Sequence, residues 1–429
     1  MPLNTILSDS YRTFRESVLS TPLSLLHSQS RYRTALLSRL IADDGLRTYY
    51  YGMGVDDTDV RTFLAGFIHD ISEQMPNFGG RVSQVGMERP DDHPKLLAAL
   101  IEDVAHLSDE PFVLLIDEFD RADVADDLEK FLEALIENAP AHCHIVLSGR
   151  GLPRLPWMAL IARRKAIMLR DAEIIRRNFY DNQSLDNPRL RLTGFGQGEV
   201  NLDGRVVTGW EGHLPRLLLF FALERPYTTR SEMCVEFWPE LQVDQAVNVF
   251  HVTKRRLHKA LDGIGNDILI HVGSYYRIIA DLTLHYDVDD FVGAILAGRL
   301  AEDPAERLAA WNRVIELHAH PFLQGHPEKW IVRRRHDYLT GWIEAMTGIA
   351  AQRHAEGRTE NALLLYQKAV GEDVRRQDIH RQIMALYSEL GRRSEIQTYY
   401  GRMRDDLKAA GTAIEGETKS LYETLMAAD

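Results

Sequence analysis

The sequence predicts a multidomain protein with an α/β domain built on a parallel sheet, a mixed middle block and an all-helical C-terminal domain. Three observations predict this fold class. The chain has 429 residues, and at about 150 residues per domain this length suggests three domains. The first 187 residues alternate between apolar runs and helical patterns, and the last part repeats a helical pattern. The expected parts are residues 1–180, a linker at 181–187, residues 188–283 and residues 284–429.

Composition and charge exclude several classes of protein. Hydrophobic residues make up 45% and charged residues 26% of the chain, which is ordinary for a globular protein. The formal net charge of −13 excludes a polybasic protein that binds nucleic acid over its whole surface. No stretch has the length and apolarity of a membrane span, and the start lacks the pattern of a signal peptide. Since Cys143 and Cys234 cannot build a disulfide framework, we expect a cytoplasmic protein without membrane contact.

The α/β domain is predicted from apolar runs that alternate with helical patterns. Residues 23–26, 112–116 and 144–147 are short apolar runs, which suit buried parallel strands. Residues 47–54 have an extended pattern, and helical patterns lie between the runs. Strands separated by helices favour a parallel sheet.

Two acids follow the apolar run at 112–116. Asp117 and Glu118 stand where a buried strand ends, which suits carboxylates that hold a hydrated Mg²⁺ and polarise water. The later strand ends in Ser148-Gly149-Arg150. Together these stretches resemble the Walker B strand and the sensor of STAND-type ATPases. The resemblance implies a P-loop NTPase-like fold, here truncated because the linker follows the sensor too soon.

The phosphate-binding loop departs from that family. A P-loop needs glycines, a lysine and a serine or threonine around the phosphates. At the expected place Arg31 and Arg33 replace glycines and Thr34 replaces the lysine. We therefore expect a degenerate, non-hydrolysing domain, and neither ATP nor Mg²⁺ is predicted as a cofactor. The vestigial nucleotide site would comprise Arg31, Arg33, Thr34, Asp117, Glu118 and Arg150.

The middle block carries a succession of strands, helices and a hairpin. Thr229 and Glu232 have the spacing of a capping box at a helix start. Phe237 and Trp238 follow, then a helical pattern at 244–261 and a hairpin pattern at 268–278. This succession resembles the winged helix-turn-helix of OmpR-type regulators, and more closely that of the SARP family of transcriptional regulators. It implies double-stranded DNA as a partner.

The helix at 244–261 holds the candidate recognition face. It contains no acid between Gln245 and Leu261. Phe250, Leu257 and Leu261 should face the core, and Lys254 departs from the family by lying on this buried stripe. The outward residues offer guanidinium, amide and apolar groups that can read a major groove. His258 and Lys259, nearer the C-terminal end of the helix, suit phosphates. The candidate DNA-binding residues are Asn248, His251, Val252, Arg255, Arg256, His258 and Lys259, with Thr229, Arg230, Tyr276 and Arg277 from the flanking elements.

The C-terminal part repeats after 34 residues. Gly357-Arg358 recurs as Gly391-Arg392, and this period is typical of tetratricopeptide-like helix pairs. Residues 284–429 also resemble the bacterial transcriptional activator domain of SARP-type regulators, through stretches such as 320–323 and Trp330. The resemblance implies homodimerisation and contact with RNA polymerase.

No stretch predicts a metal site or an enzyme. The histidines at 142 and 144, and those at 318, 320 and 326, lack the number and spacing of ligands that zinc needs. We find no nucleophile–base motif.

We therefore expect a sequence-specific DNA-binding transcriptional regulator, an activator, with an N-terminal pseudo-ATPase module that senses or inhibits. Two alternatives remain open. One is a nucleotide-dependent STAND switch with weak ATPase activity, and the other is a protein-interaction scaffold that binds no DNA.

Overall fold

The structure is a computed structural model that describes residues 3–26, 33–86, 92–149, 153–169, 188–225, 228–272, 275–279 and 282–427. The chain forms two compact units. The first comprises Met1–Gly194, Gly198–Asp289 and Pro327–Trp330, and the second comprises Phe195–Gln197, Asp290–His326 and Ile331–Asp429. Among the described residues, no helix is long and apolar enough to cross a membrane. The predicted linker at 181–187 lies outside the described residues.

The N-terminal part contains a five-stranded sheet in the order β2-β3-β4-β1-β5. Every neighbouring pair in it is parallel, which confirms the predicted parallel α/β region. The side chains of β1, β3, β4 and β5 are buried at nearly every position, because helices cover both faces of such a sheet. The strands are β1 (Leu23–Leu26), β2 (Thr48–Gly52), β3 (Phe112–Asp117), β4 (Cys143–Ser148) and β5 (Ala166–Leu169).

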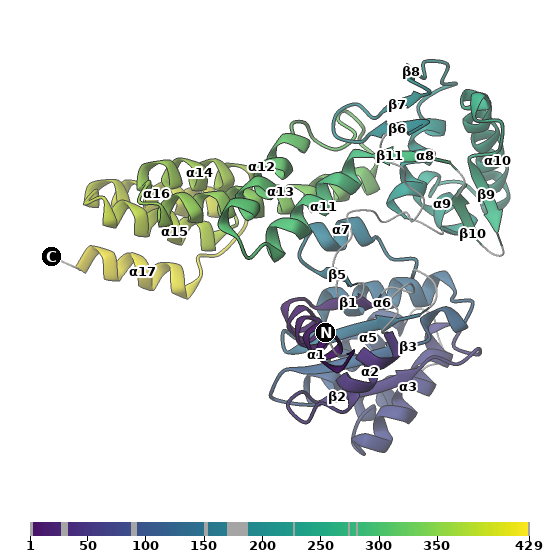
Figure 1. The fold of residues 1–429 in the computed structure, drawn as a ribbon, viewed down its shortest axis with the longest axis horizontal. Helices are drawn as coiled ribbons and strands as arrows, with labels where there is room; N and C mark the ends of the chain where they lie inside the picture. Colours follow the sequence, from purple (N-terminus) through teal and green to yellow (C-terminus); the bar gives the residue numbers. More distant parts are fainter. Residues whose placement is uncertain are drawn as a thin grey trace. The chain divides into compact units, whose positions relative to one another are not determined.

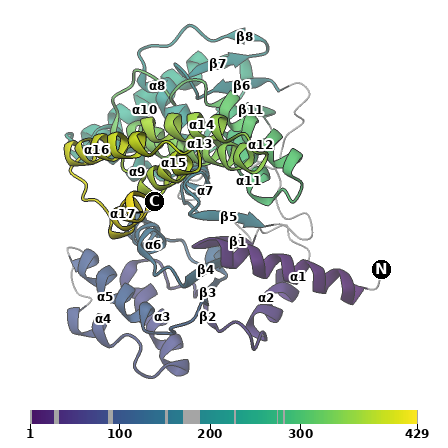
Figure 2. The same ribbon diagram turned by 90° about the vertical axis from the view of Figure 1, so that its left-hand side faces the viewer.

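Helices flank this sheet on two sides. Figure 2 shows α1 and α2 on one side of the strands and α3 to α6 on the other. The best-defined start is that of α3, where Asp59 and Thr62 form a reciprocal capping box. The helices are α1 (Leu3–Ser20), α2 (Arg33–Ile41), α3 (Val60–Gln74), α4 (Gly80–Val85), α5 (His93–Ala105), α6 (Asp126–Asn138) and α7 (Trp157–Ala162). A short 3-10 helix, η2 (Phe119–Arg121), follows β3.

The middle block combines a small sheet, three helices and a hairpin (Figure 1). The four-stranded sheet has the order β11-β6-β7-β8. The predicted helical pattern from residue 284 was wrong at its start, because Leu284 and Tyr286 are buried in β11, which pairs with β6. The strands are β6 (Leu190–Thr193), β7 (Glu199–Leu202), β8 (Arg205–Val206), β9 (Leu269–Val272), β10 (Tyr275–Ile278) and β11 (Leu284–Tyr286); the helices are α8 (Leu214–Glu224), α9 (Arg230–Phe237), α10 (Val243–Ala260) and the 3-10 helix η3 (Asp262–Ile264).

The second unit is helical, and its repeat is visible in the turns. Gly357 and Gly391 follow α13 and α15, and both adopt a positive φ, +76° and +70°. A positive φ costs glycine little and a side-chain-bearing residue more, so the 34-residue period places the same turn twice. The unit's helices are α11 (Asp287–Leu300), α12 (Pro304–Leu317), α13 (Lys329–Ala355), α14 (Thr359–Glu372), α15 (Gln377–Glu389), α16 (Arg393–Ala409) and α17 (Gly416–Ala427).

Candidate nucleic-acid interface

Helix α10 has one buried and one exposed face. Phe250 and Leu257 are fully buried, as is Leu261 just beyond the helix, which confirms the predicted core stripe. Lys254 is half-buried, and its Nζ lies 5.4 Å from the centre of the Tyr276 ring. This cation–π contact explains how a lysine fits on the inner stripe.

The outward residues of α10 lie where the helical spacing places them. Asn248, His251, Val252, Arg255 and Arg256 are all exposed. Val252 keeps 39% of its surface exposed, although an isolated valine gains by burial. The exposed face therefore carries the side-chain types that read base edges.

An acid that sequence reasoning missed lies against the C-terminal end of this face. Glu211 binds Lys259 Nζ at 2.7 Å and Arg256 Nε at 3.2 Å. The hydrogen bond from Lys259 is the largest cause that lowers the pKa of Glu211. Arg256, predicted on the groove-facing side, and Lys259, predicted as a phosphate contact, are thus paired to one carboxylate, and these exposed pairs are weak enough to exchange. Arg255 forms no such ion pair with a described residue, although its charge also lowers the pKa of Glu211, and its side chain is exposed.

His258 turns inward. Its Nδ1 lies 2.7 Å from Asp267 Oδ1, and its Nε2 accepts from the Leu269 N–H at 3.4 Å. Burial lowers the pKa of His258, and Asp267 opposes that shift. The imidazole ties α10 to the start of β9, so its ring nitrogens are engaged within the block.

The start of α9 forms the predicted capping box. Thr229 Oγ1 accepts from the Glu232 N–H at 3.1 Å, and Glu232 Oε2 accepts from the Thr229 N–H at 2.9 Å. The box confirms Thr229 as the helix N-cap. Arg230 follows it and is exposed.

The β9–β10 hairpin places its three candidate residues differently. Tyr276 is only 5% exposed; its ring meets Phe250 edge-on, and its backbone pairs with Thr228. A buried ring cannot reach DNA from this position, because core packing already occupies its surface. Arg277 is partly exposed. Tyr275 faces the α/β domain, where its hydroxyl donates to Asp123.

The vestigial nucleotide residues are engaged with the protein itself. Arg33 Nη1 donates to the Gly149 carbonyl at 2.6 Å, which ties the start of α2 to the loop after β4. Thr34 is exposed. Asp117 Oδ1 accepts from the Glu118 N–H at 2.8 Å, and Glu118 pairs with Arg121 at 2.6 Å. Arg31 and Arg150 lie outside the described residues.

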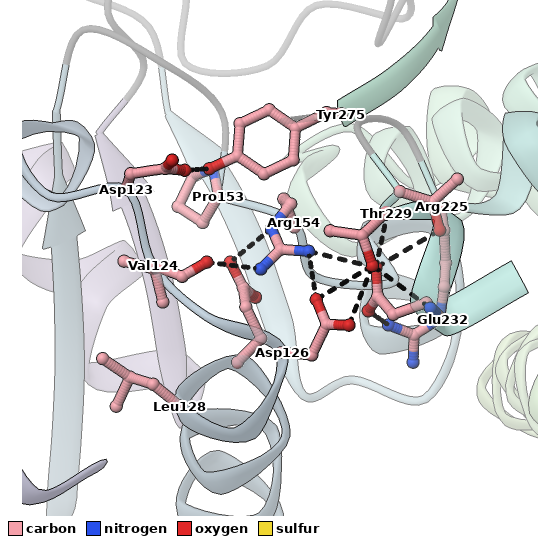
Figure 3. Close-up of polar contacts among 12 residues, drawn as sticks. Asp123, Val124, Asp126, Leu128, Pro153, Arg154, Arg225, Thr229, Glu232 and Tyr275 are labelled. Atoms are coloured by element: carbon pink, nitrogen blue, oxygen red, sulfur yellow. Dashed lines mark hydrogen bonds and ion pairs between the residues drawn. The ribbon is translucent and has the colours of Figure 1, made fainter. Parts of the chain in front are cut away.

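A buried ion cluster joins the α/β domain to the start of α9 (Figure 3). At its centre is Arg154, whose side chain is 5% exposed. Its Nη1 donates to Asp126 Oδ1 and to Glu232 Oε2, both at 3.0 Å, and its Nη2 donates to the Val124 carbonyl at 2.6 Å. Its Nε lies 3.4 Å from Glu129 Oε1.

The edges of the cluster reach both α9 and the hairpin. Thr229 Oγ1 lies 3.0 and 2.8 Å from the two oxygens of Asp126. The Arg154 guanidinium lies over the Tyr275 ring, 4.9 Å from its centre. Arg225, at the end of α8, binds Glu133 at 2.9 Å and lies 3.6 Å from Glu232. Sequence patterns could not show this cluster, because its members come from segments far apart in the chain.

Comparisons with known proteins identify the C-terminal part. Residues 286–426 match the family model described as the bacterial transcriptional activator domain. No curated protein matches the chain. Among solved structures, Mycobacterium tuberculosis EmbR in complex with a low affinity phosphopeptide is similar, with 19% identity and a TM-score of 0.46. That match covers 56% of this chain and 65% of the EmbR chain.

Proposed function

We propose that the chain, whose residues 286–426 match the bacterial transcriptional activator domain, is a SARP-type transcriptional regulator that binds double-stranded DNA through its middle block. In this proposal residues 188–283 form a winged helix-turn-helix with α10 as the recognition helix and β9–β10 as the wing. Three helices followed by a hairpin, with a basic exposed face on the last helix, are the features of such a module.

One observation carries the proposal. The exposed face of α10 presents Asn248, His251, Val252 and Arg255 in one row, with the apolar stripe on the opposite side. An amide can bind adenine, a guanidinium can bind guanine, and an apolar group can contact the thymine methyl. The row offers these amide, guanidinium and apolar groups together on one exposed face, and from this combination we infer base contacts there.

The flanking contacts of the proposed interface go to phosphates. Arg256 and Lys259 can leave Glu211 for DNA, because a DNA phosphate offers the same charge. Thr229, Arg230 and Arg277 lie at the ends of the elements beside α10. Tyr276 and His258 support the fold of the block rather than the contact, because their side chains are turned inward.

Replacing Arg255 by alanine is expected to weaken DNA binding about tenfold or more, since a base-reading guanidinium contributes about 1–3 kcal/mol. The measurement is a gel shift with fragments selected from the host genome by the full chain. Arg205→Ala is the matched control, because Arg205 is equally exposed but lies on β8. Equal affinity of Arg255→Ala and the control would refute the assignment of α10.

We also propose that the α/β domain is a pseudo-ATPase that regulates the middle block. Two observations support the loss of nucleotide chemistry. The chain lacks the glycines and lysine of a P-loop, and Arg33 already donates to the Gly149 carbonyl. With Asp117 and Glu118 held by local contacts, the acids serve the turn after β3.

A titration with ATP and Mg²⁺ is expected to show no saturable binding to the full chain, because no backbone cradle for phosphates is encoded. Isothermal calorimetry with Asp117→Ala as the comparison checks this result. Heat that saturates in the wild type and disappears in the variant would instead favour a nucleotide-dependent switch.

For the C-terminal helical domain we propose homodimerisation and contact with RNA polymerase. The matched activator domain and its repeated helix pairs support a role in protein contacts, because stacked helix pairs present extended surfaces for partners. Sedimentation of the full chain and a pull-down with RNA polymerase test the two partners separately.

A further inference from the structure

We propose that an acidic latch in the α/β domain holds the DNA-binding block in a state of low affinity. The latch consists of Asp123, Asp126, Glu129 and Arg154, and it contacts Thr229, Glu232 and Tyr275 of the middle block (Figure 3). This inference rests on the proposed DNA-binding function and adds the residues through which the α/β domain would regulate it.

Asp126 and a DNA phosphate would compete for the hydroxyl proton of Thr229. The Thr229 hydroxyl lies 2.8 Å from Asp126 Oδ2 and 3.0 Å from Asp126 Oδ1. A threonine hydroxyl has a single proton to donate. While it donates to Asp126, it cannot donate to a DNA phosphate at the start of α9, so the two contacts exclude each other.

The latch also places negative charge beside the start of α9. Asp126, Asp127 and Glu129 all lie in the first turn of α6, and Asp126 faces the start of α9. A DNA phosphate placed at Thr229 would meet the Asp126 carboxylate at close range. Like charges at such a distance repel. The latch therefore makes a phosphate position beside Thr229 unfavourable.

The latch contacts both elements that flank α10, namely α9 and the β9–β10 hairpin. Asp126 and Arg154 contact α9, while Asp123 accepts from Tyr275 in the hairpin and Arg154 stacks on its ring. The exposed face of α10 itself stays open. We infer that α10 can meet DNA in the latched state, while the supporting contacts of α9 and the hairpin become available only after release.

The ion pairs of the latch are stable because most of their side chains are buried. Arg154, Glu129 and Glu232 are each at most 6% exposed at their side chains. Hydrogen bonds of a charged group in such surroundings are stronger than exposed ones. Asp126 is the accessible member, with 23% of its side chain exposed, so its charge can be removed with the least disturbance of the core.

The test compares the full chain with Asp126→Asn, which keeps the shape of the side chain and removes its charge. We expect Asp126→Asn to bind a selected genomic fragment about tenfold more tightly, because one charge-assisted contact is worth about 1.5–3 kcal/mol. Glu137→Gln, which neutralises an acid of α6 that binds Arg163 instead, is the control and should leave affinity unchanged. Tyr275→Phe, which removes only the hydroxyl, should tighten binding by a smaller factor.

A second readout needs no DNA. Amide hydrogen exchange in residues 228–236 should become faster in Asp126→Asn and stay unchanged in Glu137→Gln. Equal affinity of Asp126→Asn and the wild type for a fragment that both bind would overturn the latch and leave DNA binding intact. Failure of every chain, Asp126→Asn included, to bind any genomic fragment would overturn the proposed function itself.

Discussion

Replacing Arg154 by alanine should lower the free energy of unfolding by about 3–5 kcal/mol, the cost of breaking a buried ion pair from one side. Burial alone would lower the pKa of Arg154, but Glu129 and Glu232 raise it, so the guanidinium stays charged. Its removal takes the paired cation from Glu129 and Asp126 and leaves Glu232 with Arg225 alone. Urea-induced unfolding of the wild type and of Arg154→Ala measures the difference in unfolding free energy.

A matched control and a double variant show whether charge causes this loss. Arg121→Ala breaks an exposed pair with Glu118 at 2.6 Å, and such pairs contribute about 0–1 kcal/mol. Adding Glu129→Gln to Arg154→Ala should recover part of the stability, since one uncompensated carboxylate is removed. An Arg154→Ala chain as stable as Arg121→Ala would contradict the role given to the cluster.

Replacing Glu129 by glutamine should stabilise the protein at pH 8 and leave it nearly unchanged at pH 5. Desolvation by burial raises the pKa of Glu129 to about 7, and the Glu232 charge adds to this shift, while Arg154 and Arg225 oppose it. Asp126 and Thr229 are the other polar groups of the cluster. The Glu129 Oε2 atom has no hydrogen-bond partner among the described residues, so its ionised form is poorly solvated.

The direction of the pH effect follows from proton binding. Between the ordinary glutamate pKa and about 7, the folded chain holds a proton on Glu129 that the unfolded chain has released. The stability contributed by this proton is full below the unfolded pKa and is lost as the pH rises through about 7. The loss amounts to a few kcal/mol on the scale of 1.36 kcal/mol per pKa unit.

Unfolding curves of the wild type and Glu129→Gln from pH 4.5 to 8.5 measure this effect. The difference in unfolding free energy between the two chains should grow as the pH rises to about 7 and then level off. Glu137→Gln is the control, because that acid lies at the surface of the same helix. A difference that does not change with pH would show that Glu129 is ionised throughout.

Elements with a strong local pattern were predictable from the sequence. The apolar run at 112–116 predicts the strand that the structure has at Phe112–Asp117, and the helical spacing of residues 128–136 predicts the helix at Asp126–Asn138. The capping box of Thr229 and Glu232 follows from residue types three positions apart. For the helix and the cap the deciding interactions lie within one or two turns, whereas for the strand the local apolar run indicates burial but not the strands with which it pairs.

Contacts between distant segments were not predictable in this way. Glu129 lies beside the apolar stripe of α6, where a charged residue is usually exposed, yet it is buried because Arg154 reaches it from another segment. Likewise, Tyr276 has the alternation of a hairpin residue, and the rings of Phe250 and His271 beside it explain its burial. Helical or strand periodicity indicates that a side chain is inward, but not which partner it meets.

In our proposal α10 reads DNA while the α/β domain restrains the elements beside it. The most direct test is the salt dependence of DNA binding by the full chain, Asp126→Asn and Arg255→Ala, each titrated on one selected fragment. We expect a steeper plot of log affinity against log salt for Asp126→Asn than for the wild type, and a shallower one, by about one unit of slope, for Arg255→Ala. Three equal slopes would contradict it.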